Sequence, residues 1–291
     1  MAKSFDFSVR SIDKLAQADA SMALLEDIGT GDLTASLIDP GQQTIARVLA
    51  RERAVLCGSA WVQAAVLQLD PYATLTWHVQ DGQWCTANQV VLEVKGQARS
   101  LLSAERTALN FLQLLSGVAT KTARYVEAVK GTKARIVDTR KTLPGLRLAQ
   151  KYAVRTGGGI NHRVGLYDAI LIKENHIAAA GGIAEVLTRA AALADQADFV
   201  EIEVENLEQL SHALNAGARM VLLDNMDLTS LRLAVEINAG RAILEISGGV
   251  TLDDLHTLAQ TGVDRISIGT LTKDVQAIDF SMRFAPIKDP A

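Results

Sequence analysis

The stretch Val200-Glu201-Ile202-Glu203-Val204-Glu205 alternates strictly between apolar and acidic side chains. Successive side chains of a β-strand point to opposite faces, so a strand here would have one apolar face and one charged face. A central strand of an open parallel sheet, covered by helices on both sides, instead reads as a continuous apolar run. The alternation therefore favours a β/α barrel, whose strands pack one face against helices and turn the other toward a polar interior.

Similar runs recur on both sides of this stretch. From about Ile136 onward, short β-branched runs alternate with Ala- and Leu-rich stretches of helical period. The last four runs, centred on Ile202, Leu222, Leu244 and Ile266, lie about twenty to twenty-two residues apart, which is one β/α unit each. The predicted class is α/β with a C-terminal β/α barrel, and the spacing leaves open whether that barrel is complete or incomplete.

The first part of the chain has a different pattern. β-like runs at residues 46–58 and 88–96, helical patterns near 13–26 and 59–70 and a turn at Asp81-Gly82 predict an α+β sandwich domain. A long helical pattern follows, with Ser103 as its expected N-cap, Gly117 weakening it midway and Gly131 as its stop. We expect an N-terminal domain over 1–115, a barrel over 116–275 and a C-terminal segment, 276–291, that packs back on the first domain.

The composition is that of an ordinary globular protein: 291 residues, 48% hydrophobic, with a formal net charge of -4. This charge gives no general attraction to nucleic acid, so anion binding has to come from local clusters of Lys and Arg. The only cysteines, Cys57 and Cys85, form no zinc motif or disulfide framework, and the N-terminus has no long apolar stretch. We expect a cytoplasmic protein that binds neither nucleic acid nor membrane.

Cationic side chains follow two of the predicted strands. Thr139-Arg140-Lys141 leaves the first strand for a Pro-Gly turn, His162-Arg163 follows three glycines, and Lys173 comes directly after the apolar run AILI. Carboxyl ends of barrel strands carry active sites, and Arg and Lys together suit a substrate with several anionic groups. A solvated loop is the alternative for Arg140 and Lys141, and a structural hydrogen-bonding role is the alternative for His162.

Two carboxylates, Glu203 and Asp224, stand near the ends of their strands. Oxygen ligands beside bound phosphates favour Mg²⁺, although these groups would equally stabilise a developing positive charge. Structural pairing with a neighbouring Lys is the remaining alternative for each.

Glycine turns follow the last two predicted strands, at Ser247-Gly248-Gly249 and at Ile268-Gly269-Thr270. Such turns expose backbone N–H groups, and the helix start expected after the first would add partial positive charge. The last two strand ends of a barrel commonly bind phosphate, so these residues are candidate phosphate ligands.

The chain resembles the quinolinate phosphoribosyltransferase family over nearly its whole length. The resemblance rests on long motifs in one order: EDIGTGDLT at 26–34, SAERTALNFLQLLSGVAT at 103–120, DTRKTLPGLR at 138–147 and KYAVRTGGGINHRVGLYDAILIKENHI at 151–177, followed by EIEVEN, LLDNM, EISGGV and ISIGT. We find no departure from the family pattern at a position that bears on the site.

The resemblance implies an enzyme of NAD biosynthesis. It would transfer phosphoribosyl from phosphoribosyl pyrophosphate to quinolinate with decarboxylation, releasing nicotinate mononucleotide, pyrophosphate and carbon dioxide, with Mg²⁺ at Glu203 and Asp224. Lys141, Glu203 and Asp224 would be catalytic. The substrate-binding residues it implies are Arg106, Thr139, Arg140, Lys141, His162, Arg163, Lys173, Glu203, Asp224, Ser247, Gly248, Gly249, Ile268, Gly269 and Thr270. Arg106 would reach the neighbouring subunit's site in a homodimer, with a larger assembly left open.

Three other functions fit parts of the pattern. A nicotinate phosphoribosyltransferase, or a related transferase encoded with molybdate transport, would share the fold, but His162-Arg163 together with Arg140-Lys141 favours a dicarboxylate. A Schiff-base aldolase would use a lysine at a strand end, as Lys173 is. A non-catalytic dicarboxylate or phosphate sensor would have no need of Glu203 and Asp224.

Overall fold

The computed structural model describes residues 5–284, which form two compact units. The first unit consists chiefly of Thr122–Leu143 and Gly159–Lys273, and the second of Phe7–Lys121, Pro144–Gly158 and the chain from Asp274 onward. Among the described helices, none combines the length and the hydropathy that a membrane crossing requires.

The first unit is built on a parallel sheet with the strand order β6-β11-β10-β9-β8-β7. Its strands are β6 (Arg135–Val137), β7 (Ile170–Ile172), β8 (Val200–Val204), β9 (Met220–Asp224), β10 (Ile243–Ser247) and β11 (Arg265–Ser267). Beyond β6 the order is extended by a parallel bridge between Val137 and Ile160. No strand pairing among the described residues joins β6 to β7, so closure into a barrel stays a prediction.

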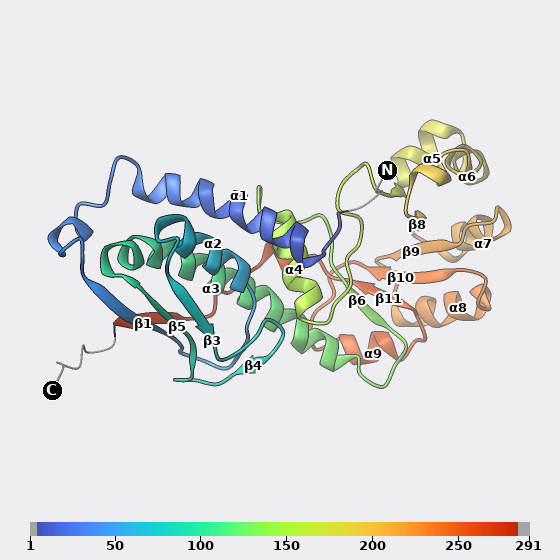
Figure 1. The fold of residues 1–291 in the computed structure, drawn as a ribbon. Helices are drawn as coiled ribbons and strands as arrows, with labels where there is room; N and C mark the ends of the chain where they lie inside the picture. The colour runs from blue at the N-terminus through green and yellow to red at the C-terminus, as the bar shows by residue number, and fades with distance from the viewer. Residues whose placement is uncertain (1–4, 285–291) are drawn as a thin grey trace. The chain divides into compact units, whose positions relative to one another are not determined.

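Helices alternate with these strands, which confirms the α/β class. They are α5 (Glu174–Ala180), α6 (Ile183–Ala191), the 3-10 turn η2 (Ala194–Gln196), α7 (Leu207–Asn215), α8 (Leu228–Asn238), α9 (Leu255–Ala259) and α10 (Thr270–Lys273). Polar residues begin two of them: the Asn206 side chain accepts from the Gln209 N–H at 2.9 Å, and Asp227 accepts from Ser230 N–H at 2.7 Å. In Figure 1, α7 and α8 lie along the side of strands β9 and β10.

The alternation in β8 separates two buried environments. Ile202 and Val204 are fully buried on one face, as expected for side chains packed against helices. Glu201, on the other face, is also fully buried, and so is Glu245 at the corresponding face of β10. The charged face therefore turns toward a polar interior that excludes water at its deepest points.

The second unit contains an antiparallel sheet with the order β12-β1-β5-β3, which confirms the expected α+β character of the first part of the chain. Its strands are β1 (Gln43–Ala50), β3 (Thr74–Trp77), β5 (Val90–Gln97) and β12 (Phe280–Phe284), with a separate pair of β2 (Ala54–Val55) and β4 (Trp84–Cys85). The helices are α1 (Val9–Ile28), the 3-10 turn η1 (Ala35–Leu37), α2 (Ser59–Leu69), α4 (Arg147–Thr156) and the long α3 (Ala98–Ala128), whose residues from Thr122 onward belong to the first unit. Figure 1 shows α1 and α2 as neighbours, α2 running beside the sheet.

The start of α3 differs from the prediction. The helix begins at Ala98, directly after β5, so Ser103 is not its N-cap. The Ala98 N–H donates to the Gln42 carbonyl at 2.8 Å, which lets the chain turn from strand to helix without a loop. The Ser103 hydroxyl lies within the helix and donates to Asp32 Oδ2 at 2.8 Å.

Gly117 does not interrupt α3, which runs through it. Its role is to let the segment around Gln276 pack closely against the helix. A Cβ at this position would overlap the carbonyl oxygen of Gln276, so only glycine lets that segment approach the helix. Downstream of it, β12 pairs antiparallel with β1, from Ala46 opposite Phe284 to Ala50 opposite Phe280. Residues 285–291 of the predicted C-terminal segment lie outside the described residues, and the predicted domain boundaries at 115 and 275 stay predictions.

Candidate active site

A pocket of about 340 Å³ lies in the parallel unit, where several strands end. Ser247 and Ser267 are the last residues of β10 and β11, and Lys173 directly follows β7. The pocket is lined by Thr139, Arg140, Lys141, His162, Arg163, Leu171, Lys173, Glu203, Leu222, Glu245, Ser247 and Ser267. Segments that are far apart in the sequence therefore meet at one site, as expected for carboxyl ends of parallel strands.

Lys141 is held over a glycine. Its N–H donates to the Thr139 hydroxyl at 3.1 Å, and its carbonyl accepts from the Thr272 hydroxyl at 2.8 Å. A Cβ at Gly269 would lie 2.9 Å from Lys141 Cδ and 3.7 Å from its Nζ. Glycine at 269 is thus needed for the close passage of the lysine side chain, rather than for an unusual backbone angle.

Arg140 and Arg163 bring two half-buried guanidinium groups to the pocket. Burial lowers the pKa of Arg163, and the positive charge of Arg140 lowers it further. The Nε of Arg140 is buried and has no hydrogen-bond partner among the described residues. Two like charges partly removed from water, one with an unpaired donor, would both be stabilised by a bound anion.

Lys173 and Glu203 form an ion pair on the pocket wall. The Lys173 Nζ lies 2.7 Å from Glu203 Oε2, with 44% and 12% of the two side chains exposed. The prediction gave Lys173 to the substrate and Glu203 to a metal, whereas the structure pairs them, as the structural alternative for Glu203 anticipated. Any ligand that contacts one partner must therefore separate the pair or join it.

Glu203 and Asp224 lie on the same face of neighbouring strands. Glu203 is in register with Leu222 of β9, and Asp224 is two residues further along that strand, opposite Ser247 of β10. Asp224 is half-buried, and its Oδ2 accepts from the Asn225 side chain at 2.9 Å. Carboxylates and a hydroxyl form an oxygen-only donor set, which fits the preference of Mg²⁺. Asp224 itself is not among the residues that line the pocket.

The two glycine turns are present as expected, but the helices after them are short. Gly248 has φ 109°, and a Cβ there would overlap Asn225 Oδ1 and lie 3.1 Å from the Asn225 nitrogen. The helix after this turn, α9, has 5 residues and begins only at Leu255, and α10 has 4 residues. Backbone N–H groups of the turns, rather than a long helix dipole, therefore remain as candidate phosphate ligands. Ile268 is buried, so only its main chain is available to a ligand.

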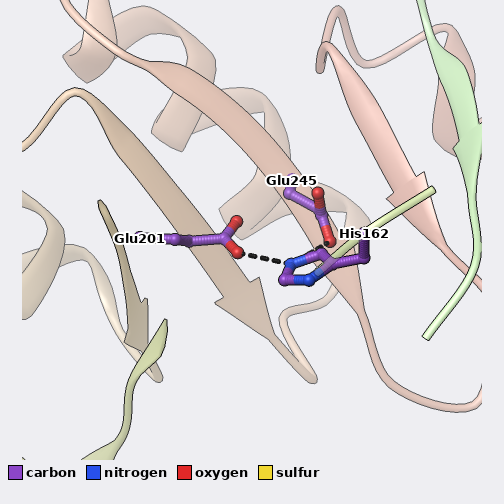
Figure 2. A group of neighbouring side chains, drawn as sticks. All are labelled: His162, Glu201 and Glu245. Carbon is purple, nitrogen blue, oxygen red and sulfur yellow. Dashed lines mark hydrogen bonds and ion pairs between the residues drawn. The ribbon is translucent and has the colours of Figure 1, made fainter. Parts of the chain in front are cut away.

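His162, Glu201 and Glu245 form a buried cluster, and two of them, His162 and Glu245, line the pocket (Figure 2). His162 Nε2 is 2.7 Å from Glu201 Oε2 and 3.7 Å from Glu245 Oε1. Burial raises the pKa of Glu201 to about 8 and that of Glu245 to about 7, and the nearby Glu201 carboxylate adds to the increase at Glu245. The His162 Nδ1 accepts from the Arg163 N–H at 2.8 Å, so direct donation from the ring to a substrate would require one of its bonds to break.

Residues beyond those predicted hold the site in place. Asp138, fully buried, accepts from the His162 N–H at 2.8 Å and from the Asn161 side chain at 2.7 Å. Glu201 and Glu245 complete the cluster. The polar alternation of the strands was a signal for both glutamates, since it put them on the interior face, but their contact with His162 depends on the fold.

Arg106 lies on the exposed surface of α3, in the other unit, and does not line the pocket. Gly248, Gly249, Ile268, Gly269 and Thr270 are also absent from its lining. The ligand-binding roles assigned to these residues therefore stay predictions.

Comparison with known proteins covers most of the chain. Residues 32–116 match the model of the quinolinate phosphoribosyl transferase N-terminal domain, and residues 118–283 match that of the C-terminal domain. The chain is 43% identical to the probable nicotinate-nucleotide pyrophosphorylase [carboxylating] of Bacillus subtilis, over 89% of each chain. It is also 43% identical to the nicotinate-nucleotide pyrophosphorylase [carboxylating] of Mycobacterium leprae, over 89% of this chain and 94% of the relative.

Solved structures agree with these sequence matches. The nicotinate-nucleotide pyrophosphorylase from Francisella tularensis superposes with a TM-score of 0.91 and 46% identity, over 94% of this chain and 97% of that one. Both family models, the relatives and the shared fold thus extend over the antiparallel unit as well as the parallel one. The chain belongs to the quinolinate phosphoribosyltransferase family.

Proposed function

We propose that the pocket of the parallel unit is the active site of a decarboxylating quinolinate phosphoribosyltransferase. The reaction joins quinolinate and phosphoribosyl pyrophosphate and gives nicotinate mononucleotide, pyrophosphate and carbon dioxide, a step of NAD biosynthesis. Membership of the family and the names of relatives that are 38–43% identical over most of the chain support this activity.

The observation that carries the assignment is the unsatisfied cationic character of the pocket. Burial and the positive charge of Arg140 lower the pKa of Arg163, and the buried Nε of Arg140 has no hydrogen-bond partner among the described residues. Quinolinate carries two carboxylates on one ring, and guanidinium groups bind carboxylates through paired hydrogen bonds. We assign quinolinate to Arg140, His162, Arg163 and Lys173, with His162 acting through its orientation.

Phosphoribosyl pyrophosphate is assigned to the other strand ends. Thr139, Ser247 and the glycine turns at 248–249 and 268–270 offer hydroxyl and backbone N–H groups, which suit phosphate oxygens. Mg²⁺ would be held by Glu203 and Asp224, and when bound it neutralises charge on the pyrophosphate group that leaves. Binding there would compete with the Lys173–Glu203 ion pair, so that Lys173 becomes available to quinolinate.

The residues then support a two-stage reaction. The ring nitrogen of quinolinate attacks the anomeric carbon while pyrophosphate departs, and the carboxylates of Glu203 and Asp224 stabilise positive charge on the ribose. Lys141, whose side chain passes close over Gly269, neutralises negative charge on the reacting groups. The ring nitrogen of the adduct is quaternary and positive, so the electron pair left by departing carbon dioxide is stabilised as an ylid, which is then protonated at carbon.

Carbon dioxide release tests this assignment. The protein is incubated with Mg²⁺, phosphoribosyl pyrophosphate and quinolinate labelled in the carboxyl group next to the ring nitrogen, and labelled gas and nicotinate mononucleotide are quantified. We expect both products in equal amounts. Product from nicotinate, with none from quinolinate, would show a nicotinate phosphoribosyltransferase, and quinolinate binding without product would show a sensor.

We also propose a cytoplasmic homodimer in which Arg106 completes the partner's site. The support is the exposure of Arg106 on α3 together with its place in the SAERT motif. Mixing inactive Arg106→Ala and Lys141→Ala proteins tests it. If Arg106 acts across the interface, each mixed dimer has one intact site and activity returns, whereas an arginine that serves its own subunit restores nothing.

A further inference from the structure

The tautomer of His162 follows from its contacts. The Arg163 backbone N–H donates to Nδ1, so this nitrogen carries no proton, and the single proton of a neutral imidazole lies on Nε2. Nε2 is 2.7 Å from Glu201 Oε2, a short hydrogen bond to the oxygen of a fully buried carboxyl group. A metal at Nε2 would require the ring proton to lie on Nδ1, toward which the Arg163 N–H already points, so these contacts oppose metal binding through His162.

Other contacts hold the ring in one plane. The edge of His162 meets the ring of Phe199 at 5.1 Å and 87°, and the His162 N–H is anchored on Asp138. Glu245 is equally buried, and neither of its carboxyl oxygens has a hydrogen-bond partner among the described residues. Its oxygens lie 3.7 Å from His162 Nε2 and from Arg265 Nη1. Of the two glutamates, Glu201 is therefore the one whose hydrogen bond fixes the ring (Figure 2).

The ring in turn fixes the next residue. Because Nδ1 accepts from the Arg163 N–H, the orientation of the imidazole sets the main chain from which the Arg163 side chain enters the pocket. We propose that Glu201 is a positioning residue for quinolinate: it locks His162 in the Nε2–H tautomer, and His162 places Arg163. This inference rests on the proposed function, since it requires quinolinate to bind at Arg163.

Steady-state kinetics of Glu201 variants test the chain of contacts. Glu201→Ala should raise KM for quinolinate about tenfold, the loss expected for one buried hydrogen bond, and leave KM for phosphoribosyl pyrophosphate within about twofold. Glu201→Gln should stay close to the wild type, because its amide oxygen still accepts from Nε2–H. Glu205→Ala removes an exposed carboxylate just beyond the same strand and serves as the control, with neither KM changed.

A double-mutant cycle separates the possible outcomes. If Glu201 acts through His162, Glu201→Ala has no further effect on quinolinate KM in a His162→Ala background. Two results would overturn the positioning role and leave the pocket assignment standing. One is a tenfold rise in quinolinate KM when Glu201→Ala is added to His162→Ala. The other is a normal quinolinate KM in Glu201→Ala together with a raised quinolinate KM in His162→Ala. A normal quinolinate KM in both single variants would overturn the pocket assignment as well.

A measurement on the unaltered protein covers the case in which Glu201→Ala does not fold. The chain has 5 histidines, so the ¹⁵N NMR spectrum of histidine-labelled protein is simple, and His162 is assigned as the signal lost in His162→Gln. We expect one protonated and one unprotonated ring nitrogen near pH 7, with the proton on Nε2. A proton on Nδ1, or on both nitrogens, would overturn the proposal.

Discussion

Adding one methyl group at Gly269 should slow catalysis through Lys141. The new Cβ would lie 2.9 Å from Lys141 Cδ, so the lysine side chain has to retreat by about 0.5–1 Å to reach an ordinary contact. The backbone at 269 is compatible with alanine, and the lysine is exposed and flexible, so the stability of the fold should change by less than about 1 kcal/mol.

The expected cost falls on turnover. Displacing a catalytic group by about 1 Å reduces rates by up to about a hundredfold, so we expect kcat of Gly269→Ala to drop about 10- to 100-fold, or about 1.4–2.7 kcal/mol of barrier. Quinolinate KM should change little. Gly41→Ala is the matched control, because its Cβ would meet Asp39 Oδ1 at an ordinary 3.4 Å, remote in sequence from the pocket segments.

The assay is steady-state product formation for Gly269→Ala, Lys141→Ala and the double variant. Lys141→Ala alone should cost far more in kcat than in quinolinate binding. Once Lys141 is absent the added methyl group has nothing to displace, so the double variant should match Lys141→Ala. An additional tenfold loss in the double variant, or a normal kcat in Gly269→Ala beside an impaired Lys141→Ala, would refute this reasoning.

Three further outcomes are expected. Gly248→Ala, at φ 109° and against Asn225, should destabilise the protein by about 1–3 kcal/mol and raise KM for phosphoribosyl pyrophosphate more than for quinolinate, as thermal denaturation and kinetics would show. Chelation of Mg²⁺ should abolish turnover reversibly, and Glu203→Gln should need more Mg²⁺ for half-maximal rate; an unchanged requirement would remove Glu203 from the metal site. Burial raises the pKa of Glu201 and Glu245 above the value of about 4.5 that glutamate has in the unfolded chain, so the folded chain keeps protons that the unfolded chain releases. The free energy of unfolding should therefore fall as the pH rises from about 4.5 toward about 8. Glu245→Gln should make this fall smaller, as denaturant titrations at about pH 5, 7 and 9 would show.

Much of the fold was predictable because its signals are local. The alternation of apolar and acidic residues over 200–205 and the regular spacing of the later strands predicted parallel β/α units, and the structure confirms them. The predicted start of α3 at Ser103 was wrong. Serine is a common N-cap residue, which favoured that position in the sequence, but the actual start at Ala98 depends on the carbonyl of Gln42, which is distant in the sequence.

The site was predictable as a set of positions but not as a set of contacts. Cations after strand ends predicted a pocket, since carboxyl ends of parallel strands converge. Which charges pair is decided by three-dimensional distance, so the Lys173–Glu203 bond and the bond from His162 to Glu201 did not follow from the sequence. Arg265 and Glu245 likewise become neighbours only through the register of β10 and β11.

The pairing of β12 with β1 has a consequence for synthesis on the ribosome. The edge of β1 is covered by a strand made roughly 230 residues later, so at elongation rates of about 5–20 residues per second it waits about 10–50 s for its partner. During that time β1 presents unpaired backbone groups to other nascent chains. Premature termination before Phe280 would make this exposure permanent, so truncated chains should aggregate rather than accumulate as folded fragments.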